Sequence, residues 1–369
     1  MWVDSAERPA LAAQAFASLM TPFEPFEAHP TLGVAVSGGR DSLALALLAH
    51  EWAAARRGRV LALIVDHGLR AEAAAEAEAT CKALAEVGID AQILHWSGPK
   101  PGHGIQEVAR AERYRLLLAA CRGHGIIHLL VAHHAEDQAE TVAMRAARGS
   151  GADGLAGMAA LVEHADARIL RPLLGVSRAR LEATLRARGL RWIDDPSNDD
   201  LRFERARLRA SRRPLPRVER SAAQARTERE QELARVAVDA LEFDDDCGGG
   251  GESAAIDCTA LGRLDSAVSA RLLGRIVQAL GGRDYPARRD RLARAVARLM
   301  PAGPRGKSGK SRDFTLSRCR LMLRQGPDGV RLRWIVCPEN GKKILRKGGQ
   351  PLIPAAFFAC GGRPAPHVE

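Results

Sequence analysis

At 369 residues the chain is longer than one hydrophobic core usually requires, so we expect two or three domains of about 100–200 residues each. A formal net charge of +11 and an isoelectric point near 9.8 favour a polyanionic partner, with nucleic acid ahead of an acidic membrane surface. Aromatic residues make up only 4% of the chain, which argues against the base-stacking platforms of single-strand binders.

The seven cysteines are scattered, with no Cys-x-x-Cys pair and no histidine partners at zinc spacing. We therefore expect reduced thiols and neither iron–sulfur nor persulfide chemistry. The first 20 residues are amphipathic and carry acidic side chains, unlike a secretory signal, and no apolar run is long enough to span a membrane. These features predict a cytoplasmic protein.

Between residues 32 and 189, short apolar runs alternate with longer segments of helical period. The runs are apolar throughout, which is typical of a parallel sheet covered on both faces. The expected strands are 33–36, 60–66, 91–96 and 127–133. The helices expected after them are 42–56, 71–87, 106–122 and 136–148. This alternation predicts an α/β fold with a doubly wound, mostly parallel sheet, whose ligands bind beyond the carboxyl ends of the strands.

The segment 34–42 reads Val-Ala-Val-Ser-Gly-Gly-Arg-Asp-Ser, an apolar strand that runs into a Ser/Gly turn and the start of a helix. Gly38 and Gly39 allow the backbone to approach an anion, and the hydroxyls of Ser37 and Ser42 add donors. The turn has no lysine, unlike a Walker A loop, and its carboxylate, Asp41, would repel a triphosphate unless a cation such as Mg²⁺ lay between them. The motif predicts a site for Mg-bound pyrophosphate; a turn that serves only packing is the alternative.

A second cluster, His-His-Ala-Glu-Asp-Gln-Ala-Glu-Thr at 133–141, follows the expected fourth strand. Helical spacing places His133, Asp137 and Glu140 along one face, where they could converge on one ligand. A solvated acidic first turn, favoured by the helix dipole, is the alternative. Because this strand should lie near the phosphate loop, we expect Asp137 to be a second Mg²⁺ ligand.

Other polar residues are weaker candidates. Asp66 closes the second expected strand, where a carboxylate commonly meets a ribose or base in open α/β sheets, although Asp-His-Gly is also a serviceable turn. Arg110 and Arg113 lie near one helix face and could neutralise phosphate or RNA, with solvated surface arginines as the alternative. Arg205 and Arg207 belong to an arginine ladder that is typical of phosphate-backbone contact, with a plain charged helix as the alternative.

The composition changes in the second half of the chain. An arginine-dense stretch at 202–220 indicates a domain exit, and the segment 244–253, rich in aspartate and glycine, is expected to be an exposed loop or linker. The remaining expected helices are 222–241, 267–280 and 287–299, and the remaining expected strands are 314–316, 319–323 and 330–336. We expect three domains: 1–212; a helical domain at 213–300 with a glycine-rich linker near 245–253; and a small, basic, α+β or β-rich domain at 301–369.

Eight motifs, in this order along residues 33–209, resemble those of the bacterial tRNA(Ile)-lysidine synthetase family, which belongs to the PP-loop ATP pyrophosphatases. They are Ser-Gly-Gly-Arg-Asp-Ser at 37–42, Val-Asp-His-Gly-Leu-Arg at 65–70, Ala-Arg-x-x-Arg-Tyr at 109–114, the cluster at 133–141, Arg-Gly-Ser-Gly at 148–151, Gly-Leu-Ala-Gly-Met at 154–158, Arg-Pro-Leu-Leu at 171–174 and Asp-Pro-Ser-Asn at 195–198. Single motifs are shared by PP-loop proteins at large, whereas the complete series is specific.

The resemblance implies an adenine nucleotide alpha hydrolase-like fold and a ligase that forms a carbon–nitrogen bond. Such an enzyme uses ATP, Mg²⁺ and free L-lysine to convert the wobble cytidine of isoleucine tRNA with a CAU anticodon into lysidine, and the helical domain would contact the tRNA. The residues expected to be catalytic and to bind the metal are Asp41 and Asp137. The residues expected to bind ATP are Ser37, Gly38, Gly39, Arg40, Asp41, Ser42, Asp66 and His133. The expected lysine or tRNA contacts are Arg110, Arg113, Glu140, Arg205 and Arg207.

Two alternatives stay open at this point: another PP-loop tRNA-modifying enzyme, and a non-catalytic, nucleotide-gated RNA-binding protein. The scattered cysteines disfavour tRNA thiolation, and the lack of a recognisable glutaminase segment disfavours glutamine-dependent synthesis. The carboxylates of Asp41 and Asp137 argue against a catalytically silent protein. No membrane contact is expected, and a homodimer is one arrangement that the sequence allows.

Overall fold

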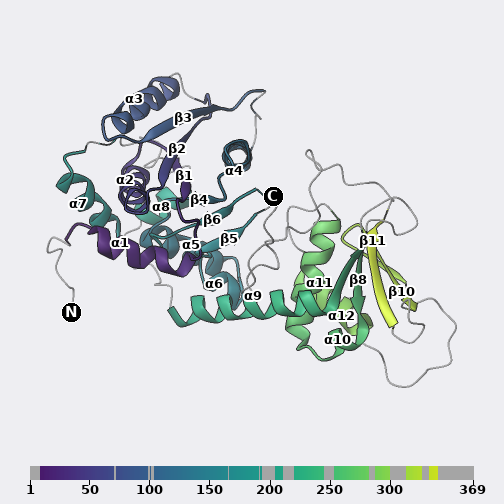
Figure 1. Cartoon of the computed structure of the whole chain (residues 1–369). Coiled ribbons are helices and arrows are strands. Elements are labelled where there is room, and N and C mark those ends of the chain that lie inside the picture. The colour runs from purple at the N-terminus through teal and green to yellow at the C-terminus, as the bar shows by residue number, and fades with distance from the viewer. Residues whose placement is uncertain are drawn as a thin grey trace. The chain divides into compact units, whose positions relative to one another are not determined.

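The computed structural model describes residues 9–69, 72–98, 100, 104–164, 166–190, 192, 204–210, 220–244, 253–281, 287–299, 313–325 and 332–339 (Figure 1). Contacts divide the chain into two compact units, Met1–Ala223 and Gln224–Glu369. Leu299 and Leu316, on either side of the boundary expected at 300, belong to one core of the second unit. The division into three domains stays a prediction.

The first unit is built on a six-stranded sheet with the order β3-β2-β1-β4-β6-β5. Neighbouring strands are parallel except at the edge, where β5 runs antiparallel to β6. The strands are β1 (Thr31–Val36), β2 (Arg59–Asp66), β3 (Asp90–His95), β4 (His128–Leu130), β5 (Leu161–Glu163) and β6 (Arg168–Leu170). The strand order reverses direction between β1 and β4, so their carboxyl ends form the crevice in which open α/β sheets bind ligands.

Helices cover both faces of this sheet, as Figure 1 shows. Alternate side chains of β2 enter different cores: Ala62 and Ile64 pack with α2, whereas Leu63 packs with α4. Burial on both faces explains why the strands read as continuous apolar runs. The helices of this unit are α1 (Ala13–Met20), the 3-10 turn η1 (Thr21–Phe23), α2 (Arg40–Ala54), α3 (Ala73–Ala85), α4 (Ile105–Gly123), α5 (Ala135–Ala147), α6 (Ala152–Leu155), α7 (Arg178–Ala187) and α8 (Glu204–Ala210).

The expected α/β alternation and the mostly parallel sheet are confirmed. One strand is shorter than expected, since β4 ends at Leu130 and not at His133. The chain leaves the sheet because the N–H of His133 turns back to donate to the carbonyl of Val131 at 3.0 Å. This turn places two histidines between β4 and α5, at the crevice.

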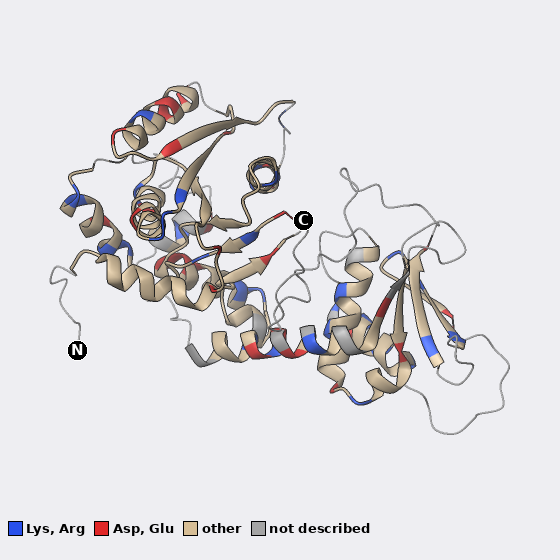
Figure 2. Ribbon diagram, viewed as in Figure 1, with Lys and Arg blue, Asp and Glu red and all other residues tan. Residues whose placement is uncertain are grey.

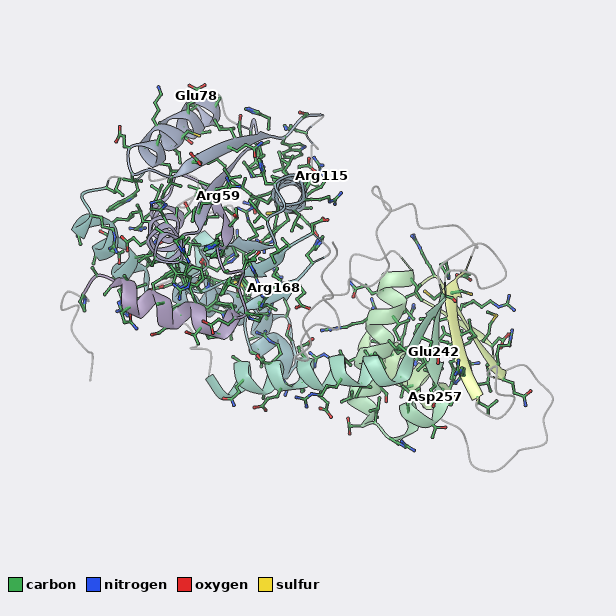
Figure 3. All side chains as sticks on the ribbon, in the orientation of Figure 1. Arg59, Glu78, Arg115, Arg168, Glu242 and Asp257 are labelled. Atoms are coloured by element: carbon green, nitrogen blue, oxygen red, sulfur yellow. The ribbon has the colours of Figure 1, made fainter. Side chains whose placement is uncertain are left out.

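The second unit contains an antiparallel sheet with the order β7-β8-β11-β10-β9. Its strands are β7 (Leu241–Asp244), β8 (Ser253–Asp257), β9 (Phe314–Leu316), β10 (Cys319–Gln325) and β11 (Leu332–Pro338), and its helices are α9 (Arg220–Ala240), α10 (Cys258–Gly262), α11 (Ser266–Leu280) and α12 (Arg289–Leu299). Asp257, labelled in Figure 3, ends β8 and caps α10 by accepting the N–H of Ala260 at 2.8 Å. Charges of both signs lie along α9 (Figure 2).

The glycine-rich run lies between two paired strands. Asp244 at the end of β7 pairs with Ser253 at the start of β8, and the side chain of Ser253 is buried. Residues 245–252 themselves lie outside the described part of the chain. The run therefore connects adjacent strands of one sheet within one compact unit.

Candidate active site

The phosphate loop connects β1 to α2 at the carboxyl end of the central strand. Gly38 has φ of 77°, in the left-handed region that glycine adopts without strain. Ser42 Oγ donates to the carbonyl of Gly39 at 2.9 Å and accepts the N–H of Ser37 at 3.1 Å, which folds the loop over the start of α2. Gly39 is the N-cap of α2 and supplies no side-chain cap, so the helix start keeps its N–H groups and positive dipole end for an anion.

Asp41, in the first turn of α2, meets His134, the N-cap residue of α5. His134 Nε2 lies 3.4 Å from Asp41 Oδ2 and 3.5 Å from Asp137 Oδ2. Asp137 Oδ2 also accepts the backbone N–H of His134 at 3.1 Å. The two expected metal ligands, which are 96 residues apart in sequence, thus converge on one imidazole nitrogen.

His134 is a cation in this environment. Burial by itself would lower the pKa of His134, but hydrogen bonds to Asp41 and Glu136 and the charge of Asp137 outweigh it and raise the pKa to about 9. Glu136 lies 3.0 Å from His134 Nδ1 and accepts the backbone N–H of Arg178. Desolvation acts to raise the pKa of Glu136, yet these hydrogen bonds give it a lowered pKa. The imidazolium therefore offsets part of the negative charge of three carboxylates.

The fit to a divalent cation depends on Asp41 and Asp137. No group of three or more His, Cys, Asp or Glu side chains in the described ranges is arranged to hold a metal. Mg²⁺ commonly uses only one or two carboxylates and completes its shell with substrate phosphates and water. Asp41 Oδ1 is buried and accepts no hydrogen bond, with Arg40 Nε at 3.7 Å. An unsatisfied carboxylate oxygen beside a phosphate loop fits a cation ligand.

Arg40, expected to bind ATP, makes a different contact in this structure. Its Nη1 donates to Glu182 Oε2 on α7 at 2.9 Å, and its guanidinium lies 5.7 Å from the ring centroid of Trp192. The side chain thus ties the start of α2 to α7. Its role in nucleotide binding stays a prediction.

His133 lies on the β6 side of the crevice. Arg171, the residue after β6, donates from Nε to His133 Nδ1 at 3.2 Å and from Nη1 to the carbonyl of Ala159 at 2.8 Å. Arg171 is only 8% exposed. The strand order places this pair and the Asp41–His134 pair at the same edge of the sheet.

Asp66 at the end of β2 is held by its own turn. Its carboxylate accepts the N–H of Gly68 at 2.8 Å and lies 3.4 Å from His95 Nδ1. Burial, followed by the charge of Arg113, lowers the pKa of the adjacent His67. The guanidiniums of Arg113 and Arg110 lie 5.8 and 5.3 Å from the ring centroid of Tyr114 on α4.

The remaining expected contacts are spread over two helices. Glu140 lies on α5 and is almost fully buried, at 1% exposed, whereas Arg207 on α8 is exposed. The side chain of Arg205 lies outside the described residues. Arg148 Nη2 pairs with Glu204 Oε2 at 2.5 Å, which connects the end of α5 to α8. The roles expected for these residues stay predictions.

The glycine-rich segment after α5 is fastened to that helix. The amide of Gln138 donates to the carbonyl of Met158 at 3.1 Å and accepts the N–H of Met158 at 2.5 Å. Arg145 Nη1 donates to the carbonyls of Gly154 and Gly157 at 3.1 and 2.7 Å. The helix that carries Asp137 therefore also holds residues 154–158 in place.

Comparisons with known proteins identify the family of the chain. A model of the PP-loop domain matches residues 11–215. A tRNA(Ile)-lysidine synthase of Bradyrhizobium diazoefficiens is 40% identical over 306 residues, which cover 77% of this chain and 84% of that protein. The chain belongs to the tRNA(Ile)-lysidine synthase family of PP-loop proteins.

Other members of the family are more similar over shorter segments. The tRNA(Ile)-lysidine synthase of Rhodopseudomonas palustris is 47% identical over 60% of this chain and 62% of its own length. That of a Bradyrhizobium species is 50% identical over 51% of this chain and 53% of its own length. The chain thus spans less than two thirds of the length of these two tRNA(Ile)-lysidine synthases.

Two side chains of this lysidine synthase family member were missed by sequence reasoning. His134 was passed over because helical spacing selected His133, Asp137 and Glu140, whereas an N-cap residue stands outside the helical period. Arg171 belongs to the Arg-Pro-Leu-Leu motif, but its partner His133 is 38 residues away in sequence. A signal for His134 was available, because it follows β4, one of the two strands at the switch point.

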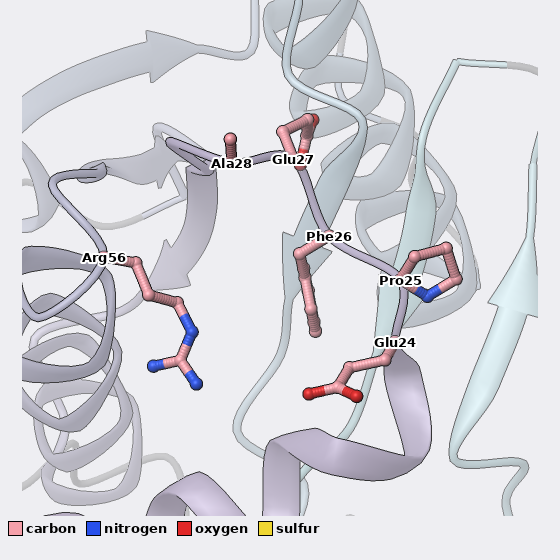
Figure 4. A pocket seen from close by; sticks show the side chains of 6 residues that line it. All are labelled: Glu24, Pro25, Phe26, Glu27, Ala28 and Arg56. Carbon is pink, nitrogen blue, oxygen red and sulfur yellow. The ribbon is translucent and has the colours of Figure 1, made fainter.

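A cavity of about 600 Å³ lies away from this site (Figure 4). It is lined by Glu24, Pro25, Phe26, Glu27, Ala28 and Arg56. The segment 24–28 precedes β1, so the cavity is at the amino ends of the strands, opposite the phosphate loop.

Within the described part of this family member, no helix is long and apolar enough to cross a membrane.

Proposed function

We propose that the protein uses ATP to join lysine to C2 of the wobble cytidine of isoleucine tRNA with a CAU anticodon, giving lysidine. The observation that carries the proposal is the convergence of Asp41 and Asp137 on His134 beside the phosphate loop, in a chain of the lysidine synthase family. The net charge of +11 supports a tRNA partner.

The reaction has two substitutions. The cytosine C2 oxygen attacks the α-phosphorus of ATP, the bond from that phosphorus to the bridging oxygen breaks, and pyrophosphate leaves. The ε-amine of lysine then attacks C2 of the adenylated cytidine, the C2–oxygen bond breaks, and AMP leaves. The amine must lose a proton in the second step, because a free ammonium has a pKa near 10.4.

The described residues divide these tasks. The loop 37–42 and the start of α2 would hold the departing pyrophosphate. Asp41 and Asp137 would hold Mg²⁺, which when bound supplies positive charge against the charge that develops on the phosphates. Glu140 is the candidate for contact with the lysine amine, and Arg110 and Arg113 for contact with tRNA phosphates or the adenylate.

The direct test is incorporation of labelled L-lysine into an isoleucine tRNA transcript with a CAU anticodon, in the presence of Mg²⁺ and ATP. We expect label in the RNA and equal amounts of AMP and pyrophosphate, with no label in a methionine tRNA that also carries a CAU anticodon. No label in the isoleucine tRNA would overturn the proposal. A cytoplasmic location, free lysine as donor and a homodimer belong to the same proposal.

A further inference from the structure

Arg171 is an almost fully buried cation whose contacts are a neutral ring nitrogen and a carbonyl oxygen. It is 8% exposed, and its donors reach His133 Nδ1 and Ala159 O. No carboxylate in the described ranges lies within ion-pair distance of its guanidinium. A buried charge without a counter-ion is costly, and a negatively charged ligand beside it would reduce that cost.

The hydrogen bond also determines the state of His133. Arg171 Nε carries a proton under all ordinary conditions, so His133 Nδ1 must present its lone pair. The ring is then neutral with its proton on Nε2, which makes the outer nitrogen a donor. Arg171 cannot hold an imidazolium in this geometry, because both partners would be donors.

Backbone contacts fix the pair in place. The N–H of Val131 donates to the carbonyl of Leu170 at 2.9 Å, and the N–H of Arg171 donates to the carbonyl of Ala160 at 2.8 Å. Arg171 therefore sits at the carboxyl end of β6, next to the end of β4, on the edge that carries the phosphate loop. The side chain has little freedom to reach another partner.

We propose that Arg171 is a positioning residue of the nucleotide site: it holds His133 as an Nε2–H donor and supplies the buried positive charge that a phosphate group of bound ATP offsets. This inference rests on the proposed function only for the identity of the nucleotide. Lysine would supply the charge but not the geometry, because one ammonium lacks the planar fork that reaches His133 and Ala159 together.

Binding of ATP with Mg²⁺ to the full chain, measured by calorimetry without tRNA, tests the charge. We expect Arg171→Gln to weaken ATP binding by about 10-fold or more, and Arg171→Lys to recover only part of the loss. The matched control is Arg168→Gln, at the start of β6, the strand that Arg171 follows. Arg168, labelled in Figure 3, donates to the carbonyls of Phe23 and Pro25 near the amino ends of the strands, and its loss should leave ATP binding within about twofold.

NMR of the ring nitrogens in protein with isotope-labelled histidine tests the positioning role. An arginine that only stabilises the fold would leave the tautomer of His133 unchanged. The signals of His133 are those that disappear in His133→Gln. We expect the unsubstituted chain to show His133 protonated on Nε2 alone, and Arg171→Gln to show a mixture of tautomers. The tautomer of His133 in the unsubstituted chain can be measured without any variant of Arg171. It therefore tests the inference even if Arg171→Gln fails to fold.

Two results would overturn the inference: ATP binding by folded Arg171→Gln within about twofold of the unsubstituted chain, or a His133 ring protonated on Nδ1 in the unsubstituted chain. Failure of the proposed function is distinguishable from either. A chain that binds ATP and loses that binding in Arg171→Gln, but puts no lysine into tRNA, keeps this inference and loses lysidine formation.

Discussion

His134 Nε2 lies 3.4 Å from Asp41 Oδ2, so one imidazole joins the phosphate loop on α2 to the acidic start of α5. The same nitrogen lies 3.5 Å from Asp137 Oδ2. Because β1 and β4 are neighbours, this contact spans the switch point of the sheet. A substitution of any one of these three side chains should therefore change the electrostatic environment of the other two.

Asp41→Asn and Asp137→Asn should each lower kcat for lysidine formation by about 100-fold or more, because each removes a charge from the candidate metal site. The fall should be largest at low Mg²⁺, and steady-state rates across a magnesium titration measure it. Asp90→Asn, at the exposed start of β3, is the control and should keep full activity. Full activity in either active-site variant would show that the carboxylate replaced in that variant takes no part in the reaction.

His134 should make the metal-free protein less stable as the pH rises. Its folded pKa of about 9 exceeds the unfolded value near 6.5, so its contribution of about 3 kcal/mol is complete below pH 6.5 and is lost as the pH rises through about 9. The free energy of unfolding, measured with urea in the presence of a chelator at roughly half-unit pH intervals between pH 6 and 9.5, tests this prediction. His134→Gln should flatten the profile, and an unchanged slope in that variant would contradict the assignment.

His128 should act with the opposite sign. Burial, and after it the charge of Arg168, lowers the pKa of His128, although Glu27 Oε2 lies 3.0 Å from its Nε2. The stability that depends on neutral His128 is thus present above about pH 6.5 and is lost as the pH falls through the lower folded value.

His128→Gln should remove this part of the acid sensitivity, as measured by the urea midpoint between about pH 7 and 5. The exposed His29, which lies before β1, is the control, and His29→Gln should keep the acid sensitivity of the unsubstituted chain. If both variants behave alike, His128 is not the titrating group.

Gln138→Ala should release the segment 154–158 from α5. The substitution leaves the N–H and carbonyl of Met158 without the partner that now holds both, at a cost of about 1–3 kcal/mol. Hydrogen exchange at residues 154–158 should rise, while exchange in β1 stays unchanged. Gln106→Ala on the exposed face of α4 is the control, and equal protection in both variants would show that the amide does not hold the segment.

The sequence was sufficient to predict the strand-helix alternation of the first unit, because strands that are buried on both faces consist of continuous apolar residues. The strands β5, β6, β7 and β8 were not among the expected strands, and the first three of them have only three or four residues. Composition identified the glycine-rich run 245–252, but it cannot distinguish a linker between bodies from the connection between β7 and β8.

For the candidate site, motif spacing selected Asp41 and Asp137, and the structure shows the contact with His134 that brings them together. That contact depends on strand order, which places the ends of β1 and β4 side by side. Local sequence pattern does not contain this information, and the same is true of Arg171 and His133, which meet only because β6 is the neighbour of β4. Pairs of this kind become visible only after the sheet is ordered.

The pairing of β7 with β8 has a practical consequence for engineering the molecule. Since Asp244 and Ser253 are cross-strand partners, extra residues inserted between them would lengthen the connection from β7 to β8 and keep the pairing on either side. A fluorescent reporter or affinity tag could be introduced there, in the compact unit that does not contain the phosphate loop.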